Sequence, residues 1–181
     1  IRERTGVRNR HIAECETASF MAAEAAKRAL ENAGISPEEI DLILVASSSP
    51  DMIFPSVACE VQKEIQAVNA AGYDMQAACT GFVFAYQSAQ AYIAAGFYKT
   101  ILIIGTETLS SMVDWADRGT CILFGDGAGA AVIRAAEGRA YLPAAHSDGC
   151  RGDALLCKSR FSSEFVEEFK KTGETPKNTY I

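Results

Sequence analysis

Apolar residues along this chain follow two patterns, a helical period of about three to four residues and short continuous runs. The first helical pattern lies between Thr17, a suitable cap, and Gly34, a suitable stop. Its apolar face consists of Ala22, Ala26, Ala29, Leu30 and Ala33. Similar patterns predict a helix that begins near Ser56 and another over residues 80–95.

The continuous apolar runs predict strands. Leu42–Ala46 and Ile101–Gly105 are apolar throughout, as expected for strands buried on both faces of a sheet. A short strand is predicted through Tyr73 toward Cys79, and another over Ala130–Ala135. The alternation of strands with helices predicts an α/β domain, a mixed sheet with helices packed on it.

The chain changes character near residue 150. Residues 1–149 contain neither an internal repeat nor a linker, and we expect one α/β unit there. Residues 150–181 are polar and charged, and we expect a surface excursion with a short helix near Ser163–Lys171 and a strand beginning at Thr179. Because the first residue is Ile1 rather than methionine, we expect a fragment of a longer protein.

Composition narrows the class of protein. With 181 residues, 49% of them hydrophobic and 22% charged, the chain is typical of soluble globular proteins. A formal net charge of −6 gives no reason to expect nucleic acid, and no apolar run approaches the roughly 18 residues that cross a membrane. Six cysteines show no CxxC pair and no metal-ligand spacing, so we expect a reduced cytoplasmic protein without a metal site.

The beginning of the chain is basic. Its positively charged or titratable residues are Arg2, Arg4, Arg8, Arg10 and His11. This segment is either a solvated surface or a site for phosphates or an acidic partner, because arginine forks match phosphate oxygens.

The run GDGAGA at Gly125–Ala130 invites comparison with phosphate-binding loops. It lacks the sixth-position glycine of a dinucleotide loop and the Gly-Lys-Ser/Thr of a P-loop. We therefore expect a glycine-rich turn with close backbone packing and no cofactor site.

The candidate for chemistry is Cys79, in the stretch DMQAACTGF at Asp74–Phe82. A thiol between a strand and a helix faces unpaired backbone N–H groups and the positive end of the helix dipole. Both favour the thiolate, and the N–H groups can hold an oxyanion. Free cysteine is also among the most buried residue types, so nucleophile and core are equal interpretations of this local sequence. Neither His11 nor His146 lies in a motif that identifies it as the base a nucleophile needs.

The loop DWADRGT at Asp114–Thr120 is also open to two interpretations. It is either a salt-bridged turn or a means of placing the guanidinium of Arg118 against a planar ring or a phosphate.

Together, five stretches resemble the beta-ketoacyl-acyl carrier protein synthase III family of the thiolase superfamily. They are RTGVRNRHIA at Arg4–Ala13, FPS at Phe54–Ser56, DMQAACTGF at Asp74–Phe82, DRGTCILFGDGAGAAV at Asp117–Val132 and HSDG at His146–Gly149. They occur in the family's order, and the resemblance fades after Gly149. It implies a thiolase-like αβαβα fold of which this chain is the N-terminal half only, without its first strand.

The resemblance implies a condensing enzyme, an acyltransferase of fatty-acid synthesis initiation. Cys79 would take an acyl group from acyl-CoA as a thioester, and malonyl-acyl carrier protein would lose CO₂ and attack that thioester. Arg4, Thr5 and Arg118 match positions that border CoA, with Arg118 near the adenine. No cofactor beyond the CoA thioester substrate is implied.

The resemblance also implies an acyl pocket and a homodimer. Leu109 and Phe124 match acyl-pocket positions, and Phe54 matches one that reaches the pocket of the neighbouring subunit. The partners implied are therefore acyl-CoA, acyl carrier protein and a second copy of the chain.

The chain departs from the family at its catalytic base. The family's histidine and asparagine lie in its second half, in motifs this sequence does not contain, so the chain alone is expected to be inactive. His11 gains no catalytic role from the comparison, and His146 matches a position without a known one. Two alternatives stay open, another thiolase-superfamily acyl-CoA transferase or synthase and a non-catalytic dimerisation or carrier-binding module.

Overall fold

The computed structural model describes residues 1–137, 141, 143–158 and 163–174. The chain forms two compact units. The first, called here the loop unit, comprises Ile1–Arg10, Leu109–Phe124 and Ala144–Ile181. The second, the sheet unit, comprises His11–Thr108 and Gly125–Pro143. The boundary expected at residue 150 stays a prediction.

The sheet unit is built on four strands in the order β2-β1-β3-β4. They are β1 (Leu42–Ala46), β2 (Ala71–Met75), β3 (Thr100–Thr108) and β4 (Asp126–Arg134). The central strand β1 is parallel to both β2 and β3, whereas β4 is antiparallel to β3. The predicted α/β fold with a mixed sheet is confirmed.

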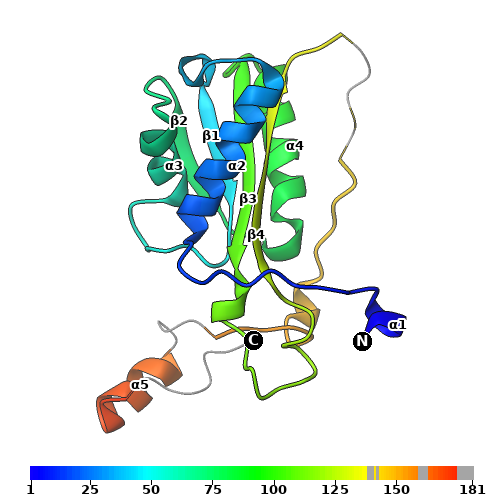
Figure 1. The fold of residues 1–181 in the computed structure, drawn as a ribbon, viewed down its shortest axis with the longest axis vertical. Coiled ribbons are helices and arrows are strands. Elements are labelled where there is room, and N and C mark those ends of the chain that lie inside the picture. The colour runs from blue at the N-terminus through cyan, green and yellow to red at the C-terminus, as the bar shows by residue number, and fades with distance from the viewer. Residues whose placement is uncertain (138–140, 142, 159–162, 175–181) are drawn as a thin grey trace. The chain divides into compact units, whose positions relative to one another are not determined.

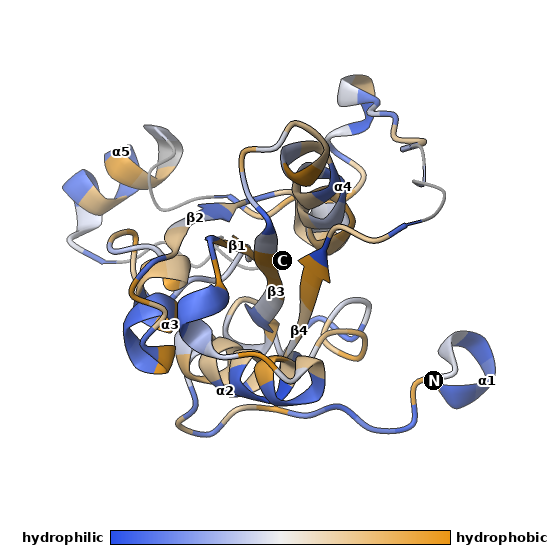
Figure 2. Cartoon of the chain, turned by 90° about the horizontal axis from the view of Figure 1, so that it is seen from above, coloured by the Kyte–Doolittle hydropathy of each residue, from blue (hydrophilic) through white to orange (hydrophobic). Residues whose placement is uncertain are grey.

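Three helices cover the two faces of this sheet. They are α2 (Ala18–Ala33), α3 (Val57–Ile65) and α4 (Gly81–Ala94). Figure 2 shows α2 and α3 on one side of the strands and α4 on the other. Along β1, Ile43 and Val45 pack in the cluster of α2 and α3, while Leu42 and Leu44 pack in the cluster of α4. Burial on both faces explains why this strand is apolar throughout.

The predicted helix ends in the sheet unit are confirmed. The side chain of Thr17 accepts a hydrogen bond from the backbone N–H of Phe20, and Gly34 ends α2 in the left-handed conformation. Ser36 and Glu39 form a capping box around a 3-10 turn. These ends are predictable because caps act on their own neighbouring N–H and C=O groups.

The predicted glycine-rich turn at residues 125–129 is wrong. From Asp126 onward these residues belong to β4, and Gly129 lies opposite Gly105 in the antiparallel ladder with β3. Pairing with β3 outweighs the weak strand preference of glycine, which depends strongly on context. The chain turns earlier, within residues 115–123.

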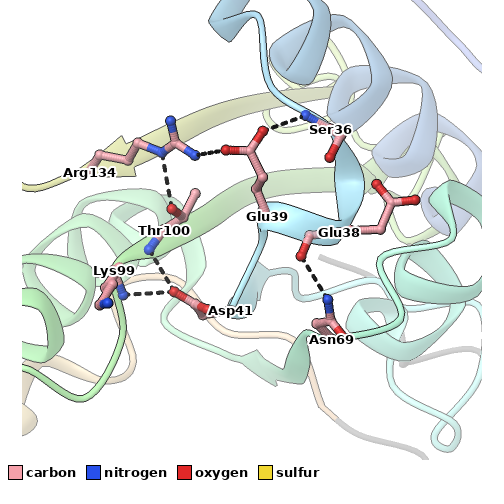
Figure 3. Close-up of polar contacts among 8 residues, drawn as sticks. All are labelled: Ser36, Glu38, Glu39, Asp41, Asn69, Lys99, Thr100 and Arg134. Atoms are coloured by element: carbon pink, nitrogen blue, oxygen red, sulfur yellow. Dashed lines mark hydrogen bonds and ion pairs between the residues drawn. The ribbon is translucent and has the colours of Figure 1, made fainter.

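Side chains tie the strands together where β1 and β3 begin and β4 ends (Figure 3). One carboxylate oxygen of Asp41 accepts from the backbone N–H groups of Lys99 and Thr100, at 2.8 and 2.9 Å. Arg134 donates to the Thr100 hydroxyl at 3.0 Å and to the carboxylate of Glu39 at 2.7 Å. This end of the sheet is closed by structural contacts, and Cys79 follows a strand at the other end.

The described residues of the loop unit contain little regular structure. Its helices are α1 (Arg2–Thr5) and α5 (Ser163–Thr172), which confirms the helix expected near Ser163–Lys171 (Figure 1). The strand expected at Thr179 lies outside the described residues. Within the described part of the chain, no helix is long and apolar enough to cross a membrane.

Candidate functional site

Cys79 lies in a 3-10 turn, Ala78–Thr80, between β2 and α4. Because β1, β2 and β3 are parallel, this turn lies at the edge where their carboxyl ends meet. Cys79 is exposed. In the part of the chain that the structure describes, Cys79 is therefore not a core residue, and its role as nucleophile stays a prediction.

The backbone around Cys79 is unusual. Ala78, the preceding residue, has a φ of 44°, in the left-handed region that non-glycine residues rarely adopt. The backbone N–H and the hydroxyl of Thr80 both donate to the carbonyl of Ala77, at 3.2 and 2.8 Å. Strained backbone of this kind persists where its surroundings hold it, and it is common at functional sites.

The residues after Cys79 anchor its turn on the sheet. A Cβ at Gly81 would lie 2.8 Å from the Cβ of Ala46, and one at Gly105 would lie 3.3 Å from the ring of Phe82. Ala46, the last residue of β1, is the partner of Gly105 in β3. Small residues on both strands thus form the place where α4 begins.

Asp74, at the start of the same motif, binds a different element. Its two carboxylate oxygens accept from the backbone N–H groups of Val57 and Ala58, at 2.7 and 2.8 Å, at the beginning of α3. A carboxylate there satisfies free N–H groups and interacts favourably with the helix dipole. Asp74 therefore joins the strand before Cys79 to the segment after Phe54, whose side chain is 82% exposed.

Two further carboxylates, which the sequence analysis missed, hold the segment that carries Phe54. Glu107 accepts from the N–H of Ser48 at 2.9 Å and from the hydroxyl of Ser49 at 2.5 Å. Asp51 accepts from the N–H groups at the start of α2, including that of Ala18 at 2.7 Å. In the sequence, Glu107 and Asp51 are marked only by a position beside serines or at a strand end. Acidic residues are common at such positions, so the pattern does not predict a functional role.

Three predicted site residues lie on one segment of the loop unit. Leu109 and Phe124, at its two ends, are half-buried, and Arg118 is exposed. Asp117 shapes the turn at Arg118, accepting from the Thr120 hydroxyl at 2.7 Å and the Gly119 N–H at 2.8 Å. These hydrogen bonds, that of Thr120 first, lower the pKa of the Asp117 carboxyl from its ordinary value.

The other two predicted CoA-bordering residues, Arg4 and Thr5, belong to α1. The hydroxyl of Thr5 donates to the carbonyl of Ile1 at 2.9 Å and accepts from the N–H of Val7 at 3.1 Å. Arg4 is exposed. The predicted site residues thus divide between the units: Cys79 and Phe54 lie in the sheet unit and the others in the loop unit. Their assembly into one site stays a prediction.

The two histidines lie in different units, His11 in the sheet unit and His146 in the loop unit. The carbonyl of His11 accepts from the N–H of Asp126 at 2.8 Å, a backbone role, and His146 is exposed. Among the described residues, no group of three or more His, Cys, Asp and Glu side chains could hold a metal ion.

Comparisons with known proteins agree on one family. The profile of 3-Oxoacyl-[acyl-carrier-protein (ACP)] synthase III matches residues 73–149, which include Cys79. The beta-ketoacyl-[acyl-carrier-protein] synthase III of Clostridium acetobutylicum is 53% identical over 158 residues, covering 87% of this chain and 49% of that protein.

Solved structures show the same likeness. The crystal structure of 3-oxoacyl-(acyl carrier protein) synthase III from Pseudomonas aeruginosa PAO1 superposes with a TM-score of 0.84 at 37% identity, covering 99% of this chain and 54% of that one. The synthase III from Aquifex aeolicus VF5 gives a TM-score of 0.74 at 49% identity over 76% of this chain and 44% of that one. Over most of its length the chain therefore matches the 3-oxoacyl-acyl carrier protein synthase III family, and it spans about half the length of the relatives that it matches.

Proposed function

We propose that Cys79 accepts the acyl group in the condensation that begins fatty-acid synthesis. The observation that carries this proposal is an exposed cysteine in a strained turn, at the carboxyl edge of parallel strands, within the residues that match the family profile. Ligand sites of α/β sheets gather at this edge.

The proposed chemistry has two steps. The Cys79 thiolate attacks the thioester carbonyl of acyl-CoA, the CoA thiolate leaves, and the acyl group stays on Sγ. Malonyl-acyl carrier protein then loses CO₂, and the resulting carbanion attacks the acyl carbon, which forms 3-oxoacyl-acyl carrier protein and releases the Cys79 thiolate. Backbone N–H groups near the start of α4 would stabilise the oxyanion of each step.

The loop unit would supply the substrate contacts. Arg4, Thr5 and Arg118 would border CoA, where guanidinium groups suit phosphates and a planar base. Leu109 and Phe124 would line the acyl pocket. No resident cofactor or metal takes part in this scheme, since the thioester itself is the activated substrate. The proposed location of the reaction is the cytoplasm.

We propose further that this chain alone transfers the acyl group to Cys79 but does not catalyse the condensation. Decarboxylation leaves a carbanion, and its enolate oxygen needs donors such as the family's histidine and asparagine. No motif of this sequence corresponds to theirs.

The loading step can be measured directly. After incubation of the chain with acetyl-CoA, intact-protein mass spectrometry should find one added acetyl group, and peptide mapping should place it on Cys79. Cys79→Ser should abolish the adduct, while Cys59→Ser, which removes another exposed cysteine, should keep it. An adduct that persists in Cys79→Ser would refute the assignment, and the absence of any adduct on folded protein would favour a non-catalytic module.

A further inference from the structure

Arg10 contacts the loop that carries Arg118. Both belong to the loop unit. The Nη1 atom of Arg10 donates to the carbonyl of Cys121 and, at 3.2 Å, to the carbonyl of Phe124. Its guanidinium carbon lies 5.5 Å from the centre of the Trp115 ring, within the range of a cation–π contact. Arg10 is therefore not part of a freely solvated basic surface.

These contacts fall on both sides of Arg118. Trp115 precedes it by three residues, whereas Cys121 and Phe124 follow it. The indole N–H of Trp115 donates to the carbonyl of Ser110 at 3.1 Å, which joins the first side of the loop to its beginning. With Asp117 shaping the turn between the two sides, Arg10 connects the sides to each other.

The chemistry of the contacts requires arginine. The carbonyls of Cys121 and Phe124 lie outside helix and strand, so they need donors from elsewhere. A guanidinium can donate to two carbonyls in its plane and stack its face on an indole at the same time. A lysine ammonium keeps the charge but has no plane to stack, so the two residues are not interchangeable here.

We propose that Arg10 is a positioning residue, which holds residues 115–124 so that Arg118 and Phe124 can bind the nucleotide and acyl ends of CoA thioesters. This inference rests on the proposed function, because CoA is the ligand that it names. Arg10 itself need not touch the substrate or Cys79.

The effect on the loop has its own spectroscopic readout. Trp115 is the single tryptophan of the chain, so the tryptophan emission reports the surroundings of this one side chain, which include Arg10. Arg10→Met and Arg10→Lys should both change its intensity and its quenching by acrylamide. Arg8→Met, at an exposed arginine two residues earlier, should leave both unchanged.

The effect on the ligand is measured by CoA titration calorimetry and by the rate of Cys79 acylation against acetyl-CoA concentration. Loss of hydrogen bonds to a charged group should weaken CoA affinity about tenfold in both Arg10 variants, with the saturated acylation rate within about twofold of the parent. Arg8→Met should match the parent. Circular dichroism and thermal unfolding identify any variant that fails to fold. Arg10→Lys perturbs folding less than Arg10→Met does, because lysine keeps the positive charge.

The outcomes separate the two proposals. Suppose that the parent chain binds CoA and that folded Arg10→Met keeps the parental CoA affinity and tryptophan emission. That result would overturn the positioning role of Arg10 and leave the proposed function standing. If Arg10→Lys keeps the parental CoA affinity and tryptophan emission, a guanidinium is not required at this position. A parent that neither binds CoA nor acylates Cys79 would overturn the proposed function and the ligand named here with it.

Discussion

At the residue scale, the lack of a side chain at Gly81 determines how closely the turn of Cys79 approaches the sheet. Gly81 has ordinary right-handed helical dihedrals, with φ −54° and ψ −46°, so its backbone does not require glycine. The requirement is spatial, since a Cβ would lie 2.8 Å from that of Ala46. Two backbone-supported atoms at that distance must move apart.

Gly81→Ala should therefore destabilise the protein. Overpacking in a tight contact costs about 1–3 kcal/mol, which exceeds the gain in helix propensity of at most about 1 kcal/mol. Urea unfolding should show a lower midpoint. Gly127→Ala, where a Cβ would meet no atom within 4 Å, should not lower it. Equal midpoints for Gly81→Ala and the parent would mean that the start of α4 shifts freely.

At the element scale, carboxylates join helices and strands whose contact with each other is not predicted by the neighbouring sequence. Asp41 bridges β1 to the start of β3, Asp74 bridges β2 to α3, and Glu107 bridges β3 to the segment after β1. Glu39 bridges a 3-10 turn to β4 through Arg134 (Figure 3). The pKa of the Glu39 carboxyl is lowered, first by the backbone N–H of Ser36 and then by Arg134.

The pKa of Glu39 predicts a pH dependence with a definite sign. A carboxyl whose pKa is lower in the folded state stabilises the protein at pH values above its pKa in the unfolded state, near 4.5. This contribution is lost as the pH falls through the pKa of the folded state. Glu39→Gln should be less stable than the parent at neutral pH, and the difference should vanish in acid.

Urea midpoints measured at neutral pH and at steps below pH 4.5 test this expectation. Because Glu39 and Arg134 are exposed, added salt should reduce the difference. Glu31→Gln, at another exposed carboxyl, is the matched control. A difference between Glu39→Gln and the parent that stays constant into acid would contradict the linkage.

At the scale of the whole molecule, the sheet unit leaves apolar surface uncovered. Only Gly81, Ala85 and Ala89 of α4 are buried, while Phe82 and Val83 are 40% and 55% exposed. A helix that is apolar on all sides is typical of one buried between layers. This pattern suits the αβαβα arrangement, in which a second half covers the helix.

The homodimer that the family resemblance implies would make Phe54 an association residue rather than a stability residue. Phe54→Ser should leave the unfolding midpoint unchanged, because the side chain is 82% exposed, and should weaken self-association about tenfold or more. Sedimentation equilibrium measures the association. Val68→Ser, at a residue that is 71% exposed, should associate as the parent does. Parental association of Phe54→Ser would remove Phe54 from the proposed interface.

The sequence by itself determined the elements whose causes are local. The caps at Thr17, Ser36 and Ser56 and the apolar run of β1 follow from neighbouring residues, and so does the place of Cys79 between a strand and a helix. Motif order also indicated the family that the comparisons found, because the turn of Cys79 and its flanks are continuous in the chain.

Only the tertiary structure decided the contacts between distant residues. The glycines of β4 form a strand because β3 lies beside them, and the start of α4 approaches Ala46 so closely that residue 81 has no room for a side chain. Arg10 looked like one charge in a basic segment until the fold brought it to carbonyls more than a hundred residues away. Such pairings depend on where the backbone places each partner, which the pattern of neighbouring residues does not encode.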